Sequence, residues 1–441
     1  MFSHIRPLRP RVGVSAVSSP LEVGAGRAPQ AGRDLAALLE AAGCEVVALE
    51  PIGTADQAAA AGRQLAAAQV EAVALAPASW FEDYLVLDLL EECPVPVLLW
   101  PLPGMETGAL CGTQQLTSFL KYLGKPYCGV FGSLEAGPTL EQALTYLCGV
   151  ALHRKLRRAR IGLAGHRVTG MTYTGPHELA LKQALGPRVV PLDLPQFLSR
   201  AAAMPAEEAR EFWEKVLGSA GQSLVAEADG LDSMQVYLAA REVVAEEGLH
   251  AITFGCYPHL MGRVCLAASL LADEGLPVAC EGDVNGAVGQ LILALLTGQP
   301  TQHTDWLDPL PDGTVVFTHC GSGSFCLAEN PAAITLSPVR LMTQGVCTLF
   351  TVRPGPVTLL SLVPTPDGYQ CALLEGEALP AEMVFPGNPL RVQFARPVGE
   401  IIEWIFEQGI GHHWVVGLRH VGAEIRALAG LCGPTFKLLE L

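Results

Sequence analysis

The sequence predicts an α/β protein of 441 residues with three domains. Over the first two thirds of the chain, short apolar runs alternate with Ala- and Leu-rich helical patterns, which is typical of parallel sheets with helical connections. From about residue 311, Val-, Thr- and Phe-rich runs are interrupted by Gly and Pro, which indicates antiparallel strands. A chain of this length also exceeds one compact core of ordinary size.

The first domain is expected over residues 1–157. Its predicted strands are 12–17, 45–49, 72–75, 95–100 and 127–131. Residues 34–42 and 116–123 predict helices that end at Gly43 and Gly124, because Gly is favoured just after a helix. No glycine-rich phosphate-binding motif follows a strand, so this Rossmann-like layout has no nucleotide signature.

A second Rossmann-like domain is expected over residues 158–311, and a small antiparallel β-barrel or sandwich over residues 312–441. In the second domain the predicted strands are 161–164, 188–192, 251–254 and 276–279, and the predicted helices are 177–185, 205–217, 232–247, 264–272 and 284–296. In the third domain the predicted strands are 314–318, 346–352, 357–363, 370–375 and 391–395. The change of pattern near residue 311 marks the last boundary.

Composition excludes several classes of function. The formal net charge of −16 argues against a nucleic-acid or anionic membrane surface, because such surfaces need clustered Lys and Arg. Thirteen cysteines, an odd number without a C-x-x-C pair, indicate reduced core residues and a cytoplasmic location. The N-terminal segment 1–14 has no apolar stretch of signal-peptide length, and no later run predicts a membrane span.

Two carboxylates stand at the junction of a predicted buried strand and a predicted helix. Glu281 and Asp283 belong to the turn CEGD, directly before the helix that begins at Val284. Ligands bind at the carboxyl ends of strands in open α/β sheets, so the position of these two carboxylates is typical of a ligand-binding site. The alternative is that Asp283 only caps the helix and Glu281 faces solvent.

Histidines follow two other predicted strands. His319 ends an apolar strand before glycines, and His412 and His413 open the apolar run WVVGL. A single histidine in such a place is more often a core or loop residue, and an HH pair alone is a weak motif. Together with the two carboxylates, however, these histidines predict a mixed oxygen and nitrogen site for a divalent metal such as Mn²⁺.

Several motifs occur in the order found in a known enzyme family. They are CEGDVNGA at 280–287, LLTG at 295–298, Asp305, HCGSG at 319–323, RPGPVTL at 353–359 and GHHW at 411–414, preceded by FEDYLVLDLLEECPVPVLLW at 81–100 and GHRVTGM at 165–171. On these motifs the chain resembles the L-fucose and L-arabinose isomerase family over essentially its whole length.

The resemblance implies an intramolecular oxidoreductase that binds Mn²⁺ or another divalent metal and interconverts aldose and ketose through a cis-enediol. In such an enzyme the metal holds two neighbouring substrate oxygens, while carboxylates, here Glu281 and Asp283, move a proton between C1 and C2. The expected metal ligands are His259, Asp283, His319 and His412. The expected substrate contacts are Trp100, Asp305, His413 and Trp414. The resemblance also implies a homo-oligomer, commonly a hexamer.

One position departs from the family pattern. A metal-binding carboxylate ends a CWPE-like motif in the family, whereas this chain has Cys256-Tyr257-Pro258-His259 at the corresponding place before CEGD. A neutral imidazole is a weaker partner for Mn²⁺ than a carboxylate, so the sequence predicts a poor isomerase on the usual sugars. Two alternatives remain: a carbohydrate-binding or regulatory protein without turnover, and another enediolate enzyme, an epimerase or a lyase.

Overall fold

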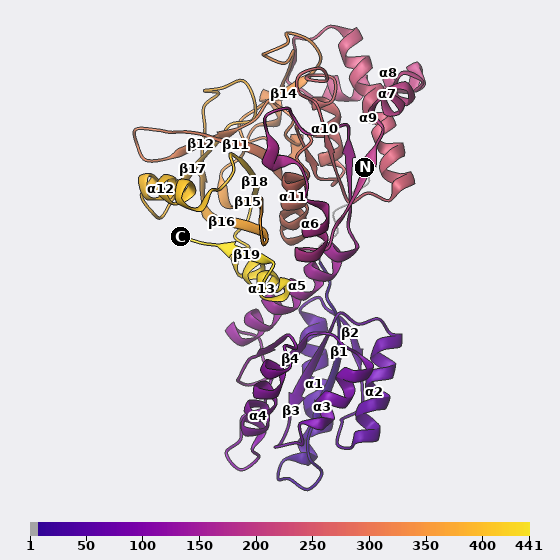
Figure 1. Cartoon of the computed structure of the whole chain (residues 1–441), viewed down its shortest axis with the longest axis vertical. Coiled ribbons are helices and arrows are strands. Elements are labelled where there is room, and N and C mark those ends of the chain that lie inside the picture. Colours follow the sequence, from indigo (N-terminus) through magenta and orange to yellow (C-terminus); the bar gives the residue numbers. More distant parts are fainter. Residues whose placement is uncertain (1–7) are drawn as a thin grey trace. The chain divides into compact units, whose positions relative to one another are not determined.

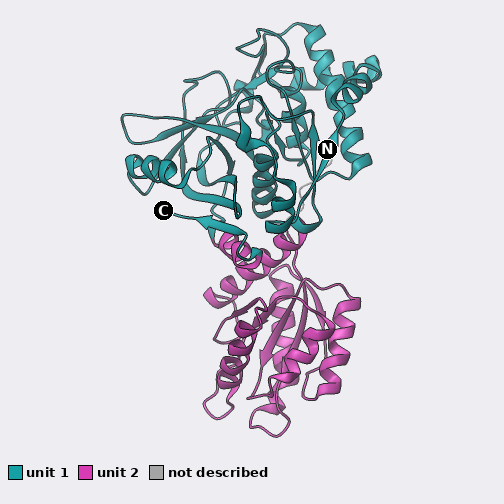
Figure 2. Ribbon diagram, viewed as in Figure 1, with its two compact units in different colours: residues 1–7, 156–422, 432–441 teal, residues 8–155, 423–431 magenta. Residues whose placement is uncertain are grey.

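The computed structural model describes residues 8–441 (Figure 1). The predicted start of the first domain and the expected absence of a signal peptide concern a segment that begins with residues 1–7, which lie outside the described part. The chain divides into two compact units (Figure 2): an N-terminal unit of residues 8–155 and 423–431, and a C-terminal unit of residues 156–422 and 432–441. The finer division of the chain into three domains stays a prediction.

The N-terminal unit is built on a five-stranded parallel sheet in the order β2-β1-β3-β4-β5, which is a doubly wound arrangement. Its strands are β1 (Arg11–Val17), β2 (Glu45–Ala48), β3 (Ala72–Pro77), β4 (Val97–Leu99) and β5 (Tyr127–Gly129). Its helices are α1 (Ala28–Ala41), α2 (Ala55–Ala67), α3 (Tyr84–Glu92), α4 (Ala109–Tyr122) and most of α5 (Pro138–Arg158) and α13 (Gly422–Cys432). Gly43 and Gly124 follow α1 and α4 with positive φ, as expected of helix-ending glycines.

The C-terminal unit contains a second parallel sheet, in the order β10-β9-β6-β7. Its strands are β6 (Arg160–Ala164), β7 (Arg188–Leu192), β9 (Ala251–Phe254) and β10 (Val278–Ala279). The accompanying helices are α6 (Glu178–Ala184), α7 (Leu194–Ala202), α8 (Ala206–Ser219), α9 (Glu227–Glu247), α10 (Cys265–Asp273) and α11 (Val284–Thr297). Short 3-10 turns occur in both units: η1 (Ala25–Arg27), η2 (Thr172–Thr174), η3 (Phe325–Leu327) and η4 (Pro331–Ala333).

The later part of the C-terminal unit forms a closed β-ring. Its strands are β11 (Gln302–Pro309), β12 (Val315–Thr318), β15 (Gly355–Thr365), β16 (Gly368–Leu379), β17 (Leu390–Phe394), β18 (His413–Gly417) and β19 (Phe436–Leu439). They run in the order β15-β18-β11-β12-β17-β16-β19, and β15 also pairs with β16, which closes the ring. Only β19 pairs in parallel, with β16. The predicted fold class, two parallel α/β sheets followed by an antiparallel barrel-like sheet, is confirmed.

A small three-stranded sheet and one further helix complete the C-terminal unit. They are the sheet β14-β13-β8, formed by β8 (Gln222–Ser223), β13 (Thr335–Ser337) and β14 (Cys347–Leu349), and helix α12 (Val398–Gln408). None of the helices within residues 8–441 is both long and apolar enough to cross a membrane.

Helix α11 joins the second parallel sheet to the β-ring. It contacts β9 and β10 of the sheet and β15 and β18 of the ring (Figure 1). Most of its residues are buried, as expected for a helix that is apolar on all sides. Glycines permit the close approach: a Cβ on Gly289 would lie 2.9 Å from Val415, and one on Gly286 would lie 2.7 Å from His303. The N-terminus of α11 therefore sits between the end of β10 and the ring.

Candidate metal centre

The CEGD turn follows β10 and buries both carboxylates. Asp283 is 1% exposed and Glu281 is 8% exposed. Asp283 is the N-cap of α11, and its Oδ1 accepts a hydrogen bond from the backbone N–H of Gly286 at 2.9 Å. The capping interpretation therefore holds for one oxygen of Asp283, but Oδ2 points to other partners. Glu281 does not face solvent.

The backbone of this turn is unusual at Glu281. Glu281 has φ 65° and Gly282 has φ 70°, so two consecutive residues are left-handed. A non-glycine residue in this region is strained, and such strain concentrates at functional sites. A Cβ on Gly282 would approach the His166 carbonyl to 2.6 Å, and the N–H of Val168 donates to the Glu281 carbonyl at 3.2 Å. The neighbouring loop thus holds the turn in place.

His413, the first residue of β18, lies between the two carboxylates. Its Nδ1 is 2.8 Å from Asp283 Oδ2, and its Nε2 is 3.0 Å from Glu281 Oε2. Burial lowers the pKa of His413, but the hydrogen bonds to Asp283 and Glu281 outweigh it and raise the pKa to about 9. Both ring nitrogens then donate, and the imidazolium neutralises part of the buried negative charge.

The same contacts keep the carboxylates ionised. Burial raises the pKa of Glu281, but the hydrogen bond from His413 and the charges of His319 and His413 lower it to about 2. For Asp283, burial is again outweighed, by hydrogen bonds from His303 and His413, and the pKa falls below its ordinary range. At neutral pH the centre therefore presents two carboxylates able to bind a cation or accept a proton.

His303 on β11 belongs to the centre and was not among the residues predicted from the sequence. Its Nε2 is 3.2 Å from Asp283 Oδ2, its ring centroid is 4.5 Å from that of His413, and it is 3% exposed. Burial, followed by the nearby charge of His413, lowers the pKa of His303 to about 4. One feature of the sequence could have indicated His303. It stands two residues before the predicted site residue Asp305, and residues two apart on a strand share a face.

His319 follows β12 and lies near Glu281. Its Nε2 is 4.0 Å from Glu281 Oε2, and its centroid is 5.3 Å from that of His303. Burial lowers the pKa of His319, but Cys320, Asp305 and Glu281 raise it well above the ordinary value. The structure thus brings His319 together with Glu281 and Asp283, as expected from their shared position at strand ends.

His412 is exposed and lies on the outer side of His413. Tyr173, a second residue that the sequence did not predict, accepts a hydrogen bond from the His413 backbone N–H at 3.1 Å, and its hydroxyl is 3.0 Å from His412 Nδ1. The backbone carbonyl of Tyr173 accepts from Asn285 of α11 at 2.9 Å. Tyr173 therefore links the histidine pair to the helix. That His412 is the ligand and His413 the supporting residue stays a prediction.

The other predicted site residues differ in their surroundings. Asp305 is half-buried, with Oδ1 3.7 Å from His413 Nε2. Trp414 is buried in the core of the β-ring. Trp100 belongs to the N-terminal unit, where it is fully buried and its indole N–H donates to the Gly132 carbonyl at 3.0 Å. His259 is exposed in the loop after β9. The roles of these residues stay predictions.

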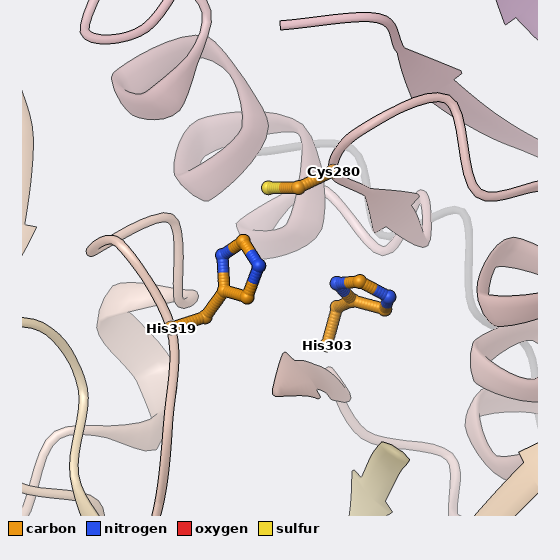
Figure 3. Close-up of side chains that lie close together, drawn as sticks. All are labelled: Cys280, His303 and His319. Carbon is orange, nitrogen blue, oxygen red and sulfur yellow. The ribbon is translucent and has the colours of Figure 1, made fainter. Parts of the chain in front are cut away.

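Four groups of side chains are spaced to hold a metal ion, with ligand atoms within 4.8 Å of one another in each. The groups are Cys280, His303 and His319 (Figure 3); Glu281, His319 and His413; Asp283, His303 and His413; and Asp305, His412 and His413. Within residues 8–441, His259 belongs to none of them. Buried atoms without a hydrogen-bond partner include His303 Nδ1, Asp305 Oδ1 and His319 Nδ1. This donor set fits a divalent metal.

Comparison with known proteins shows distant homology to sugar isomerases. The chain is 25% identical over 358 residues to the sulfoquinovose isomerase of Alkalicoccus urumqiensis, covering 78% of this chain and 80% of that protein. The sulfoquinovose isomerase of Priestia aryabhattai is 22% identical over 364 residues (79% and 81%), and that of Clostridium sp. (strain MSTE9) is 25% identical over 357 residues (76% and 79%). No protein-family model matches the chain.

Proposed function

We propose that this protein is a metal-dependent aldose–ketose isomerase of the L-fucose and L-arabinose isomerase type, with Mn²⁺ as its metal. The observation that carries the proposal is the buried bridge in which His413 contacts Glu281 at 3.0 Å and Asp283 at 2.8 Å, next to His303 and His319. The homology to sulfoquinovose isomerases over more than three quarters of the chain supports the same reaction class.

The metal would be held by Asp283 and His319 together with the histidine pair, and the geometry adds Glu281 and His303 as donors. When bound, a divalent ion would hold two adjacent oxygens of the open-chain sugar and stabilise negative charge on the cis-enediol. Apart from the exposed His412, these side chains are buried, which limits the access of water to them.

Proton transfer is assigned to the two carboxylates. Both are ionised at neutral pH, so either can accept a proton from the carbon next to the carbonyl. His413 lies between them and donates a hydrogen bond to each, so the imidazolium keeps both carboxylates ionised and in place. The carboxylate that accepts the proton from one carbon can return it to the neighbouring carbon, so the protein needs no net gain or loss of a proton.

The test is product analysis by NMR after incubation of the purified protein with Mn²⁺ and a panel of sugars. Sulfoquinovose comes first, because the curated relatives carry that name, followed by L-fucose and L-arabinose. Formation of the ketose supports the proposal. Epimers or cleavage fragments would indicate another enediolate reaction. Sugar-induced thermal stabilisation without any product would indicate a binding or regulatory protein.

Alanine substitutions at His412 and His413 distinguish their roles. The sequence favoured His412 as the ligand, but His413 belongs to three of the four groups and His412 to one. We therefore expect His413→Ala to weaken Mn²⁺ binding by roughly tenfold or more, and His412→Ala to weaken it less. Isothermal titration with Mn²⁺ measures both losses. A larger loss for His412→Ala would establish His412 as the ligand and His413 as the supporting residue. Equal and small losses would place the pair outside the metal site.

His259→Glu restores the carboxylate of the family pattern. If the loop after β9 reaches the ion, the added charge is expected to strengthen Mn²⁺ binding and to raise turnover, by up to the roughly 10²–10⁴-fold typical of a proton-transfer group. His166→Glu is the control, because it introduces the same charge at another exposed histidine, in a loop that contacts Gly255 and Gly282. Wild-type turnover at an ordinary rate, or lower activity in His259→Glu, would show that His259 is a functional residue of a different mechanism.

A further inference from the structure

The thiol of Cys280 lies beside the carboxylates but belongs to a different set of donors. Its Sγ and one nitrogen each of His303 and His319 lie within 4.8 Å of one another, and each of the three residues is at most 5% exposed. The three side chains come from three separate segments and point toward one another (Figure 3). One thiol and two imidazoles are the donors that zinc prefers, whereas Mn²⁺ prefers oxygen.

In each of the two imidazoles, one ring nitrogen has no hydrogen-bond partner. His303 turns Nε2 to Asp283 at 3.2 Å, and His319 turns Nε2 to Glu281 at 4.0 Å. The Nδ1 atom of each ring is buried and has no hydrogen-bond partner. Buried polar atoms are almost always paired, so two unpaired nitrogens in adjacent rings indicate a missing ligand.

A second buried thiol, that of Cys256, lies next to Cys280. The thiols of Cys256 and Cys280 are hydrogen-bonded to each other, and the Cys280 thiol is also 3.3 Å from the Ser322 hydroxyl. Cys256 follows β9 and Cys280 follows β10, which are neighbouring parallel strands.

We propose that Cys280, His303 and His319 form a second metal site that binds Zn²⁺ or Co²⁺ through the sulfur of Cys280. When it binds the ion, Cys280 loses its thiol proton, which is released to the buffer. Because His319 also faces Glu281, an ion at this site competes for that imidazole with an ion held by the carboxylates. The second site does not depend on whether the protein isomerises a sugar.

The experiment uses the full chain with the exposed Cys111 and Cys326 replaced by Ser, so that these thiols cannot bind added metal. Titration with Co²⁺ is expected to produce a sulfur-to-cobalt charge-transfer absorption band. Cys280→Ser is expected to abolish the band. Cys371→Ser removes another buried thiol, on β16 and outside the four groups, and is expected to leave the band unchanged.

X-ray absorption at the zinc edge gives an answer that needs no substitution at Cys280, in case that variant does not fold. The Zn²⁺-loaded protein is expected to show sulfur neighbours at about 2.3 Å. Only nitrogen and oxygen neighbours at about 2.0–2.2 Å would overturn the proposal. A cobalt band that survives Cys280→Ser would overturn it as well. Neither measurement involves sugar. If the protein binds Zn²⁺ through sulfur but forms no product from any sugar, the isomerase proposal fails and the proposal of a second metal site stands.

Discussion

Glu281→Gln is expected to lower kcat by roughly 10²–10⁴-fold at saturating Mn²⁺, because it removes a base that transfers a proton between carbons. The amide keeps the size of the side chain. Its oxygen can still accept the hydrogen bond that His413 Nε2 donates to Glu281 at 3.0 Å in the wild-type protein. The fold is therefore expected to persist. Steady-state kinetics on whichever sugar the NMR panel identifies measures the loss, and circular dichroism checks the fold.

Glu274→Gln is the matched control for this substitution. Glu274 is also a largely buried carboxylate with hydrogen bonds, from Tyr237 at 2.6 Å and Arg241 at 3.2 Å, but it belongs to none of the candidate metal groups. Its amide variant is expected to keep the wild-type kcat. If Glu281→Gln retains wild-type kcat as well, then Glu281 is not the base, and the assignment of proton transfer to this carboxylate is wrong.

Among the substitutions considered, those at Asp283 are expected to lower the free energy of unfolding the most. Asp283→Asn keeps an efficient helix cap but removes the charge that His303 and His413 contact, and breaking such a buried pair typically costs about 3–5 kcal/mol. Asp283→Ala also removes the hydrogen bond to Gly286 and is expected to cost about 1 kcal/mol more. Urea denaturation of the metal-free protein measures both losses.

Thr54→Ala provides the comparison, because Thr54 caps α2 at an exposed position and contacts no charged group through its capping oxygen. It is expected to cost about 1 kcal/mol, the usual loss for a helix cap. If Asp283→Asn is as stable as the wild type while Asp283→Ala loses only as much as Thr54→Ala, then Asp283 acts as a cap alone. The metal-site interpretation of this carboxylate would then fail.

Much of the fold was predictable because its elements have strong local patterns. Helix α11 follows from an apolar run that begins after Asp283 and ends at Gly298, which has φ 67°. The short strands of both parallel sheets follow from apolar runs between helices. Closure of the β-ring was less visible, since it depends on the pairing of β18 with β15 and with β11, segments far apart in the sequence whose register no local pattern encodes.

The sequence alone determined that Glu281, Asp283 and His319 stand at strand ends, because turn and strand patterns are local properties of the chain. Only the tertiary structure decided what surrounds them. His303 lies near the start of β11, and it reaches Asp283 because β11 pairs with β18 and α11 packs against both. Likewise, His413 is buried and His412 exposed because adjacent residues on an extended segment face opposite sides, and pairing with β11 fixes which side is inward. Contacts between segments more than a hundred residues apart form only when the chain folds, so no local pattern could show them.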